Sequence, residues 1–293
     1  MEKLIKEKIS SLLSEEEEVL SVEQLGGMTN QNYLVKTTNK QYIVKFFGKG
    51  TEKLINRQNE KYNLELLEDL DLDVKNYLFD IESGIKVNEY IESAVTLDST
   101  SIKSKFEKIA PILQTIHASG KELRGEFAPF EEIKKYESLI QGEISYPNYE
   151  TVRKSVLSLK NELEKIGIEK KSCHIDLVPE NFIEGPDGHL YLIDWEYAGL
   201  NYAANDIGCI LCRYDWSDQQ IERYLKAYIG RPMNQDERRF YYAFIPISAF
   251  YWFCWGLYKG SVGDDDSFFF LPSYRNLIRF IDKAMESYGI MGA

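Results

Sequence analysis

Residues 174–181 constrain the fold and chemistry of this 293-residue chain more than any other segment. They read His-Ile-Asp-Leu-Val-Pro-Glu-Asn, and a short strand-like run then leads to a second aspartate, Asp194. Phosphoryl transfer from a nucleotide needs one carboxylate beside the attacking hydroxyl, and an amide and a second carboxylate that hold Mg²⁺ between the phosphates. Asp176 fits the first role, and Asn181 and Asp194 fit the second. A hydrolase or a chance acidic loop would also contain such groups, but their spacing favours kinase-like chemistry.

The N-terminal part of the chain contains segments suited to gripping phosphates. Residues 26–33, Gly-Gly-Met-Thr-Asn-Gln-Asn-Tyr, lie between two strand-like runs, and a glycine turn there lets backbone N–H groups approach an anion closely. Lys45 lies in an alternating apolar run that indicates a half-buried strand, and Glu60 lies among leucines at helical spacing. A strand lysine paired with a helix glutamate is how kinases hold the α- and β-phosphates. Each signal is weak alone, but their order before residues 174–181 makes the set specific.

The composition narrows the class of protein without identifying it. Apolar residues make up 44% of the chain and charged residues 28%, which is typical of a globular protein. A net charge of −12 argues against a nucleic-acid partner, which would require a basic surface. Residues 1–13 are charged and amphipathic, which indicates a surface helix and not a secretory signal, so we expect a cytoplasmic protein.

Two apolar features have simple interpretations. Residues 240–257 form the most apolar stretch, which is short for a membrane span, so we expect a buried helix and no membrane insertion. Cys209 and Cys212 have C-x-x-C spacing, but no second pair exists and the flanking residues are those of an apolar helix. We therefore expect reduced core cysteines.

The pattern of apolar residues predicts an α+β fold with two lobes. A β-rich lobe, residues 1–91, should contain strands near 20–25, 32–37, 42–47, 77–82 and 85–91 and one helix near 54–70. A polar linker at 92–101 leads into a larger, mainly helical lobe, residues 92–293. Its helices are predicted at 102–118, 130–142, 149–166, 203–214, 218–229, 235–259 and 272–288, with strands at 182–184 and 190–193.

Together these segments resemble the bacterial choline kinases of the LicA type, within the choline/ethanolamine kinase and aminoglycoside phosphotransferase superfamily. The resemblance covers roughly residues 20–280 and rests on Gly26–Asn30, Lys45, Glu60, Asn88–Ile91, Leu113–His117, His174–Asn181, Asp194–Tyr197, Asn201–Tyr202, Asp206–Gly208, Trp252 and Trp255. It implies a two-lobed protein-kinase-like fold that binds ATP in the cleft between its lobes.

The resemblance also implies a set of nucleotide-binding residues. These are Gly27, Thr29, Asn30, Lys45, Glu60, Glu89 and Ile91. The first three cover the phosphates, and the lysine, held by the glutamate, steadies them. The last two offer a backbone C=O and a backbone N–H to the adenine.

The catalytic residues follow from the same resemblance. Asp176 orients the substrate hydroxyl and accepts its proton, while Asn181 and Asp194 bind Mg²⁺. His174 braces the catalytic loop by hydrogen bonds, as the equivalent histidine does in the family. Asp206 is expected to accept hydrogen bonds from the backbone of that loop, and so to support it without binding metal.

An aromatic stripe is the candidate substrate site. Trp252, Trp255 and Tyr258 recur every three residues and would share one helix face. Such stripes are usually core, but a quaternary ammonium cannot donate hydrogen bonds and is recognised by aromatic faces. Beside a kinase loop, a cage for choline is the better interpretation, with Tyr197 and Tyr274 as further walls.

One residue departs from the family pattern. Where the family commonly has a glutamate that complements the ammonium charge, seven residues after Asp206, this chain has Arg213. An arginine facing trimethylammonium would repel it. Either Arg213 points away and Asp215 or Glu196 supplies the negative charge, or the substrate is not choline.

The leading hypothesis is therefore phosphoryl transfer from ATP to choline, giving phosphocholine. The alternatives are a kinase for another small alcohol, with ethanolamine first and an aminoglycoside or a sugar after it. A third class is a catalytically inactive sensor of nucleotide or choline. Inactive kinases tend to lose five residues, and this chain has all of them, which argues against the sensor: Lys45, Glu60, Asp176, Asn181 and Asp194.

Overall fold

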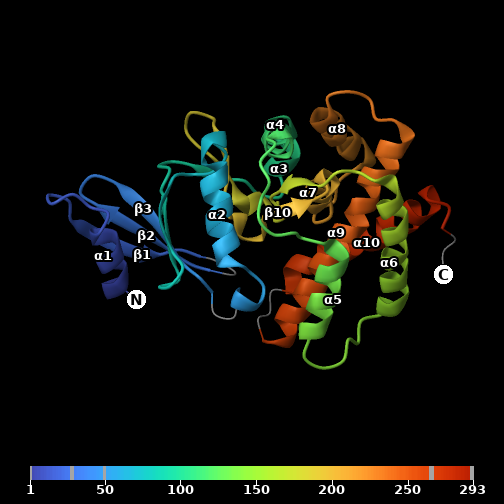
Figure 1. The fold of residues 1–293 in the computed structure, drawn as a ribbon, viewed down its shortest axis with the longest axis horizontal. Helices are drawn as coiled ribbons and strands as arrows, with labels where there is room; N and C mark the ends of the chain where they lie inside the picture. The colour runs from blue at the N-terminus through green and yellow to red at the C-terminus, as the bar shows by residue number, and fades with distance from the viewer. Residues whose placement is uncertain (1, 27–29, 49–50, 264–266, 291–293) are drawn as a thin grey trace. The chain divides into compact units, whose positions relative to one another are not determined.

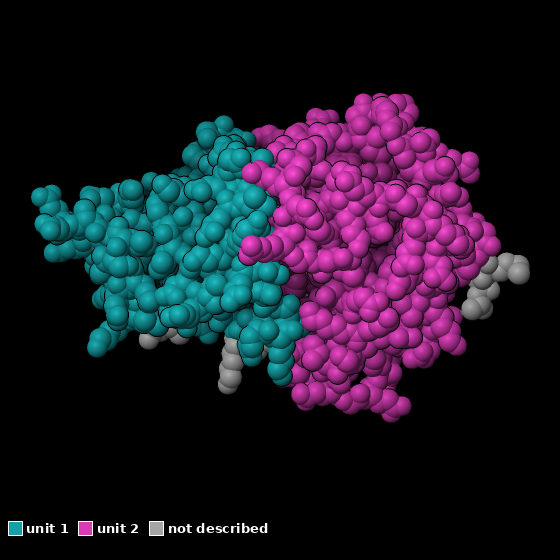
Figure 2. Space-filling model, in the orientation of Figure 1, with its two compact units in different colours: residues 1–96, 182–196 teal, residues 97–181, 197–293 magenta. Residues whose placement is uncertain are grey.

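The structure is a computed structural model of residues 1–293, and it describes residues 2–26, 30–48, 51–263 and 267–290, the side chains of 267–271 excepted. The chain forms two compact units (Figure 1, Figure 2). Unit 1 consists of residues 1–96 and 182–196, and unit 2 of residues 97–181 and 197–293. We describe each unit by itself.

Unit 1 is built on an antiparallel sheet of five strands in the order β1-β2-β3-β5-β4. The strands are β1 (Val19–Gln24), β2 (Gln31–Thr37), β3 (Gln41–Phe46), β4 (Asn76–Asp80) and β5 (Ile85–Glu89). Alternation in β3 buries Tyr42 and Val44 on one face, as a period of two requires. Helix α1 (Glu2–Ser10) adds Ile5 and Ile9, both 0% exposed, to this core.

Helix α2 (Arg57–Leu67) follows the third strand. Asn56 caps it, because its side chain accepts hydrogen bonds from the N–H groups of Gln58 and Asn59. The helix turns an unusual set of polar side chains inward, among them Arg57 and Glu60. Those side chains belong to the candidate site described below.

A second, smaller sheet completes unit 1. The hairpin β8 (Phe182–Glu184) and β9 (Leu190–Leu192) pairs with β6 (Val95–Thr96), and the N–H of Leu192 donates to Leu72 at 2.7 Å. These bonds attach residues 182–196 to the first unit. The observed units therefore differ from the predicted boundary at 91/92, because chain-distant residues 182–196 pair with the end of the N-terminal segment.

Unit 2 is mainly helical. Its helices are α3 (Ser101–Ser104), α4 (Phe106–Ala118), α5 (Pro129–Leu139), α6 (Tyr149–Ile166), α7 (Ala203–Leu211), α8 (Asp218–Ile229), α9 (Gln235–Ser261) and α10 (Ser267–Ser287). Two short strands, β7 (Lys171–Cys173) and β10 (Gly199–Asn201), pair antiparallel. Capping boxes at Ser217 and Asn234 fix the starts of α8 and α9.

Helix α9 is the core of unit 2, packed by α5, α6, α7 and α10 (Figure 1). It is long and apolar enough to cross a membrane, but 83% of its apolar window is buried within the protein, as expected for a core helix. Helices α7 and α9 approach closely at Gly208, where a Cβ would lie 2.6 Å from Ser248 Oγ and collide with the carbonyl of Phe244. All four cysteines are buried and none forms a disulfide.

Candidate active site

The loop after β7 contains the proposed catalytic residues of unit 2. A short 3-10 turn, Pro179–Asn181, brings the Asn181 side chain back over the loop. Its Nδ2 donates to the backbone carbonyl of Asp176 at 2.8 Å and to Asp176 Oδ2 at 3.2 Å. The Asp176 carboxylate is therefore oriented by the amide five residues later, as the spacing in the sequence suggests.

Asp206, on α7, supports the start of this loop. Its carboxylate accepts hydrogen bonds from the N–H groups of His174 at 2.9 Å and Ile175 at 2.8 Å. Ile175 has φ +77°, a left-handed conformation that is costly for a β-branched residue. The buried Asp206 carboxylate thus stabilises a strained backbone directly before Asp176, and His174 in the same turn is fully buried.

His117 extends this support outward. Its Nε2 lies 2.9 Å from Asp206 Oδ2, and its Nδ1 lies 2.7 Å from the hydroxyl of Tyr228. A chain of hydrogen bonds therefore runs from α8 through α4 and α7 to the loop that contains Asp176. These contacts describe a structural histidine.

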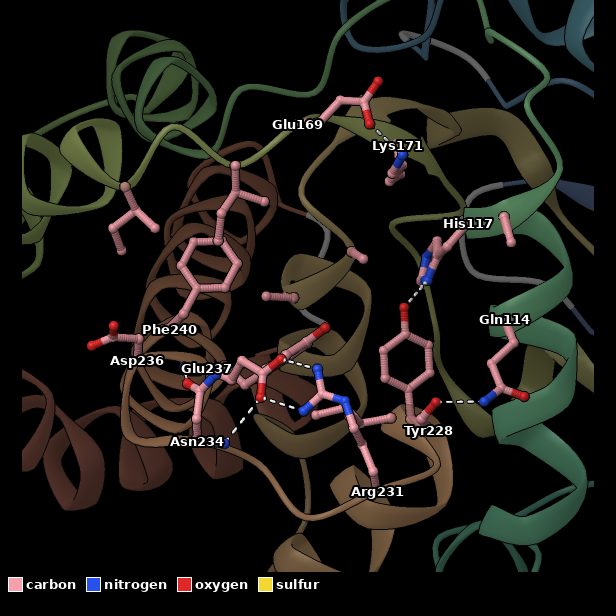
Figure 3. A pocket seen from close by; sticks show the side chains of 17 residues that line it. Gln114, His117, Glu169, Lys171, Tyr228, Arg231, Asn234, Asp236, Glu237 and Phe240 are labelled. Carbon is pink, nitrogen blue, oxygen red and sulfur yellow. Dashed lines mark hydrogen bonds and ion pairs between the residues drawn. The ribbon is translucent and has the colours of Figure 1, made fainter.

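A cavity of about 490 Å³ borders this chain of hydrogen bonds (Figure 3). His117 and Tyr228 line it and point toward one another, and Gln114 donates to the Tyr228 backbone carbonyl. Across the cavity, Arg231 pairs with both oxygens of Glu237, at 2.8 and 2.5 Å. No sequence motif predicts this cavity, because its lining comes from the ends of several separate elements.

Asp194 lies directly after β9 in unit 1. Its Oδ1 accepts from Lys45 Nζ, on β3, at 2.8 Å, and its backbone has φ +71°. The predicted ion pair between Lys45 and Glu60 was wrong. Glu60 instead lies 2.6 Å from Arg57 Nη1 and 3.4 Å from Lys86 Nζ. Arg57 is one helical turn before Glu60 on the same helix, so it is the nearer cation.

Arg57 is the centre of a buried polar network that sequence reasoning missed. Its Nη1 lies 2.9 Å from Glu196 Oε2 as well as contacting Glu60, and its Nη2 donates to Asn30 Oδ1 at 3.3 Å. Asn30 in turn donates from Nδ2 to Glu196 at 2.9 Å. The sequence signal for this role of Arg57 is its position in the first turn of a helix, three residues before Glu60.

This network holds Asn30, which was expected to cover the phosphates, in the interior of unit 1 at 5% exposure. Burial, and the nearby Asp194 carboxylate, raise the pKa of Glu196 to about 7. Arg57 opposes that increase and keeps its own pKa above the usual value. The glutamate therefore changes its charge near neutral pH.

The remaining nucleotide-binding residues are placed only in part. Gly27 and Thr29 lie outside the described residues. Glu89 is the last residue of β5, and its N–H donates to the carbonyl of Lys75 at 2.8 Å. Ile91 lies two residues later, and its carbonyl accepts from the N–H of Ala94 at 3.2 Å. Their roles toward adenine stay predictions.

The aromatic stripe forms a cluster in unit 2. The rings of Trp252 and Trp255 meet edge to face with centroids 6.0 Å apart, and Tyr197 meets Trp252 at 5.5 Å. Tyr274 does not join them, contrary to expectation. It packs on Tyr146 and Phe253, and its hydroxyl donates to Pro147, because it faces the opposite side of α9.

Arg213 lies against this aromatic cluster. Its guanidinium carbon is 4.9 Å from the centroid of the Trp252 ring, and its Nη2 is 3.5 Å from Asp176 Oδ1. Of the two orientations considered for this arginine, the structure has the inward one. One side chain therefore contacts both the predicted catalytic carboxylate and the predicted cage.

The donor set suits a magnesium ion. Because Asn181 Nδ2 is used by Asp176, its Oδ1 is the amide atom left for a ligand, and oxygen ligands are what Mg²⁺ prefers. Asp194 contributes a carboxylate beside Lys45, the arrangement of a metal ligand next to a phosphate-binding cation.

Comparisons with known proteins agree with this geometry. The sequence profile described as choline/ethanolamine kinase matches residues 22–243. The protein LicA of Haemophilus influenzae is 28% identical over 251 residues, which cover 82% of this chain and 74% of that protein. The structure of the choline kinase LicA from Streptococcus pneumoniae is 61% identical, with a TM-score of 0.86 and coverage of 97% and 99%. A structure of LicA in complex with AMP is 62% identical, with a TM-score of 0.82 and coverage of 98% of each chain.

Proposed function

The chain belongs to the choline/ethanolamine kinase family, and we propose that it transfers the γ-phosphate of ATP to the hydroxyl of choline, giving phosphocholine. It is an ATP-dependent small-molecule kinase with a protein-kinase-like fold. The AMP bound to the similar LicA supports nucleotide binding by this chain as well. Because the reaction consumes ATP, we infer that the protein acts in the cytoplasm.

Asp176 is the proposed proton acceptor. It aligns the choline hydroxyl for attack on the γ-phosphorus, and accepts the hydroxyl proton as the new P–O bond forms. Asn181 holds this carboxylate in orientation through its Nδ2. Asp206 contributes indirectly, because it fixes the backbone of the two preceding residues.

Lys45 and Asp194 are the proposed phosphate and metal groups of unit 1. When bound, Mg²⁺ would supply positive charge that stabilises the negative charge developing on the transferred phosphoryl group. Asp194 and Asn181 Oδ1 would hold the ion, and Lys45 would bind the α- and β-phosphates. Glu60 was expected to hold Lys45, but here it positions Arg57 and Lys86.

The observation that carries the choice of choline is the separation of Asp176 and Trp252. The guanidinium of Arg213 contacts both side chains, so the gap between the carboxylate and the indole is about the width of a guanidinium group. Choline has a hydroxyl at one end and a trimethylammonium at the other, two carbons away. The ammonium gains about 0.5–2 kcal/mol from each aromatic face. The aromatic faces would offer no hydrogen-bond acceptor to the three N–H donors of ethanolamine.

The test is a comparison of kcat/KM for choline, ethanolamine and a kanamycin-type aminoglycoside in an ADP-release assay. Choline should be preferred. Trp252→Ala and Trp255→Ala should raise the choline KM at least about tenfold and leave the ATP KM nearly unchanged. Phe253→Leu is the matched control, since Phe253 is on the same helix but packs against Tyr146 and Tyr274. Equal values for choline and ethanolamine would contradict the assignment of the substrate.

A further inference from the structure

Arg213 occupies the position where the proposed substrate requires a cation site. It lies on the turn between α7 and α8, with its side chain 11% exposed. Its guanidinium covers the face of Trp252 at 4.9 Å and approaches Asp176 at 3.5 Å. Trp252 and Trp255 are only 2% and 4% exposed with this arginine in place, so little of either indole is open to a ligand.

The contacts of Arg213 are those that a quaternary ammonium would make. An aromatic face attracts a cation through its quadrupole, and a neighbouring carboxylate adds a Coulomb attraction. Burial acts to lower the pKa of Arg213, but Asp176 and neighbouring groups together hold it above its usual value, so the guanidinium stays charged. Two cations cannot share one indole face, since each would lose the attraction and repel the other.

We propose that Arg213 is an internal occupant of the cation site, and that its guanidinium must leave the face of Trp252 before the trimethylammonium of choline can bind there. This inference rests on the proposed function. Its consequence is a lowered apparent affinity, because only the fraction of molecules with the arginine displaced can bind substrate. The arginine also excludes cations that bind aromatic faces weakly.

The side chain can leave while the backbone stays in place. Asn276, 2% exposed, donates from Nδ2 to the carbonyls of Cys212 at 2.9 Å and Tyr214 at 3.0 Å, on either side of Arg213. Trp216 Nε1 donates to Ile210 at 3.2 Å and fixes the far end of the turn. Displacement therefore requires a change of side-chain rotamer and no movement of the backbone.

If Arg213 had a different role beside Asp176, its removal would change the kinetics differently. If the guanidinium stabilised the transferring phosphoryl group, its removal would lower kcat and leave the choline KM unchanged. If it occupies the cation site, its removal lowers the choline KM and leaves kcat nearly constant. The two roles therefore separate in one set of steady-state measurements.

The experiment compares wild type with Arg213→Gln and Arg213→Ala, with Arg275→Gln as control. Arg275 also contributes one positive charge near this turn but is exposed, paired with Asp215. The Arg213 variants should lower the choline KM about tenfold, the change expected where the site is open about one tenth of the time. Their ATP KM, and all constants of Arg275→Gln, should change less than about twofold. A tenfold loss of kcat with unchanged choline KM would overturn the proposal.

Binding measured without turnover keeps the inference separate from the proposed function. Tetramethylammonium and N-methylguanidinium, titrated by intrinsic tryptophan fluorescence, should bind Arg213→Ala about tenfold more tightly than wild type. In turnover assays, N-methylguanidinium should compete with choline, and not with ATP, in Arg213→Ala. If choline is not phosphorylated by any variant, the proposed function fails, while the titration still decides the role of Arg213. Equal affinity of both cations for wild type and variant would refute that role.

Discussion

Lys45 Nζ lies 2.8 Å from Asp194 Oδ1, so the proposed phosphate-binding lysine and the proposed metal ligand form an ion pair within unit 1. Both side chains are largely buried, with exposures of 12% and 22%. Neither charge is left uncompensated in the absence of nucleotide. We expected Lys45 to pair with Glu60, but Glu60 instead forms ion pairs with Arg57 and Lys86.

Asp194→Ala should abolish Mg²⁺-dependent activity, because the metal would lose its main anionic ligand. Lys45 also loses its partner in this variant, so Lys45→Met is the matched comparison. It should raise the ATP KM but keep the dependence on Mg²⁺. Steady-state rates measured over a range of Mg²⁺ concentrations distinguish the two. Full activity of Asp194→Ala at ordinary Mg²⁺ would show that the metal ligand is misassigned.

Asp176→Asn should lower kcat about 10²–10⁴-fold while leaving folding and ATP binding intact, because an amide cannot accept the hydroxyl proton. Nucleotide binding by calorimetry and the melting temperature serve as controls. The hydrogen bond from Asn181 Nδ2 can still reach the amide oxygen in this variant. A loss smaller than about fivefold would remove Asp176 from the role of proton acceptor.

Asp206→Ala should destabilise the protein and lower kcat together. The buried N–H groups of His174 and Ile175 would lose their acceptor, at about 1–3 kcal/mol each. Ile175 would also lose the contact that holds its left-handed backbone. Tyr228→Phe removes only the outermost hydrogen bond of the same chain and should have a much smaller effect. Thermal unfolding and kcat, measured in parallel, test both expectations. A normal melting temperature for Asp206→Ala would contradict the supporting role.

Glu196 should make stability depend on pH. Its pKa is about 7 in the folded protein and 4.5 ordinarily, so between these values the folded state binds more protons than the unfolded state. The free energy of unfolding should therefore decrease as pH rises from about 4.5 to 7, by on the order of 2 kcal/mol. Glu196→Gln should lack this decrease, and urea unfolding at pH 5, 6, 7 and 8 measures it. Asp73, whose pKa burial raises to about 6, acts in the same direction in both proteins. Identical slopes for the two proteins would refute the contribution of Glu196.

The long periodic segments of the fold were predictable from sequence. The helix expected at 149–166 is α6 with the same ends, and the strand expected at 182–184 is β8. The strands β6, β7 and β10 have two or three residues, too few to show alternation, and were not predicted; β8 and β9 are as short but follow the motif at residues 174–181. The break between α3 and α4 at Lys105 was missed for a similar reason, since the apolar pattern continues through it.

The contact between Asp176 and Asn181 was predictable because their spacing is local, whereas the partners of buried charges were not. Lys45 and Glu60 are both close to the polar network, but which cation meets which carboxylate depends on Arg57 and Lys86, whose inward orientation no pattern indicates. Tyr274 was misplaced because its ring direction depends on how α10 packs on α9. The inward orientation of Arg213 likewise required the structure.

The chain passes between the two units after Thr96, after Asn181 and after Glu196. A gene fragment that ends at Thr96 would therefore encode Lys45 without Asp194, and β6 without the hairpin to which it pairs. Recombination between related genes that exchanged only the first part of the sequence would join a lysine from one parent to an aspartate from the other. Functional chimaeras of this chain should arise where residues 182–196 are inherited together with residues 1–96, so this short segment sets the unit of exchange.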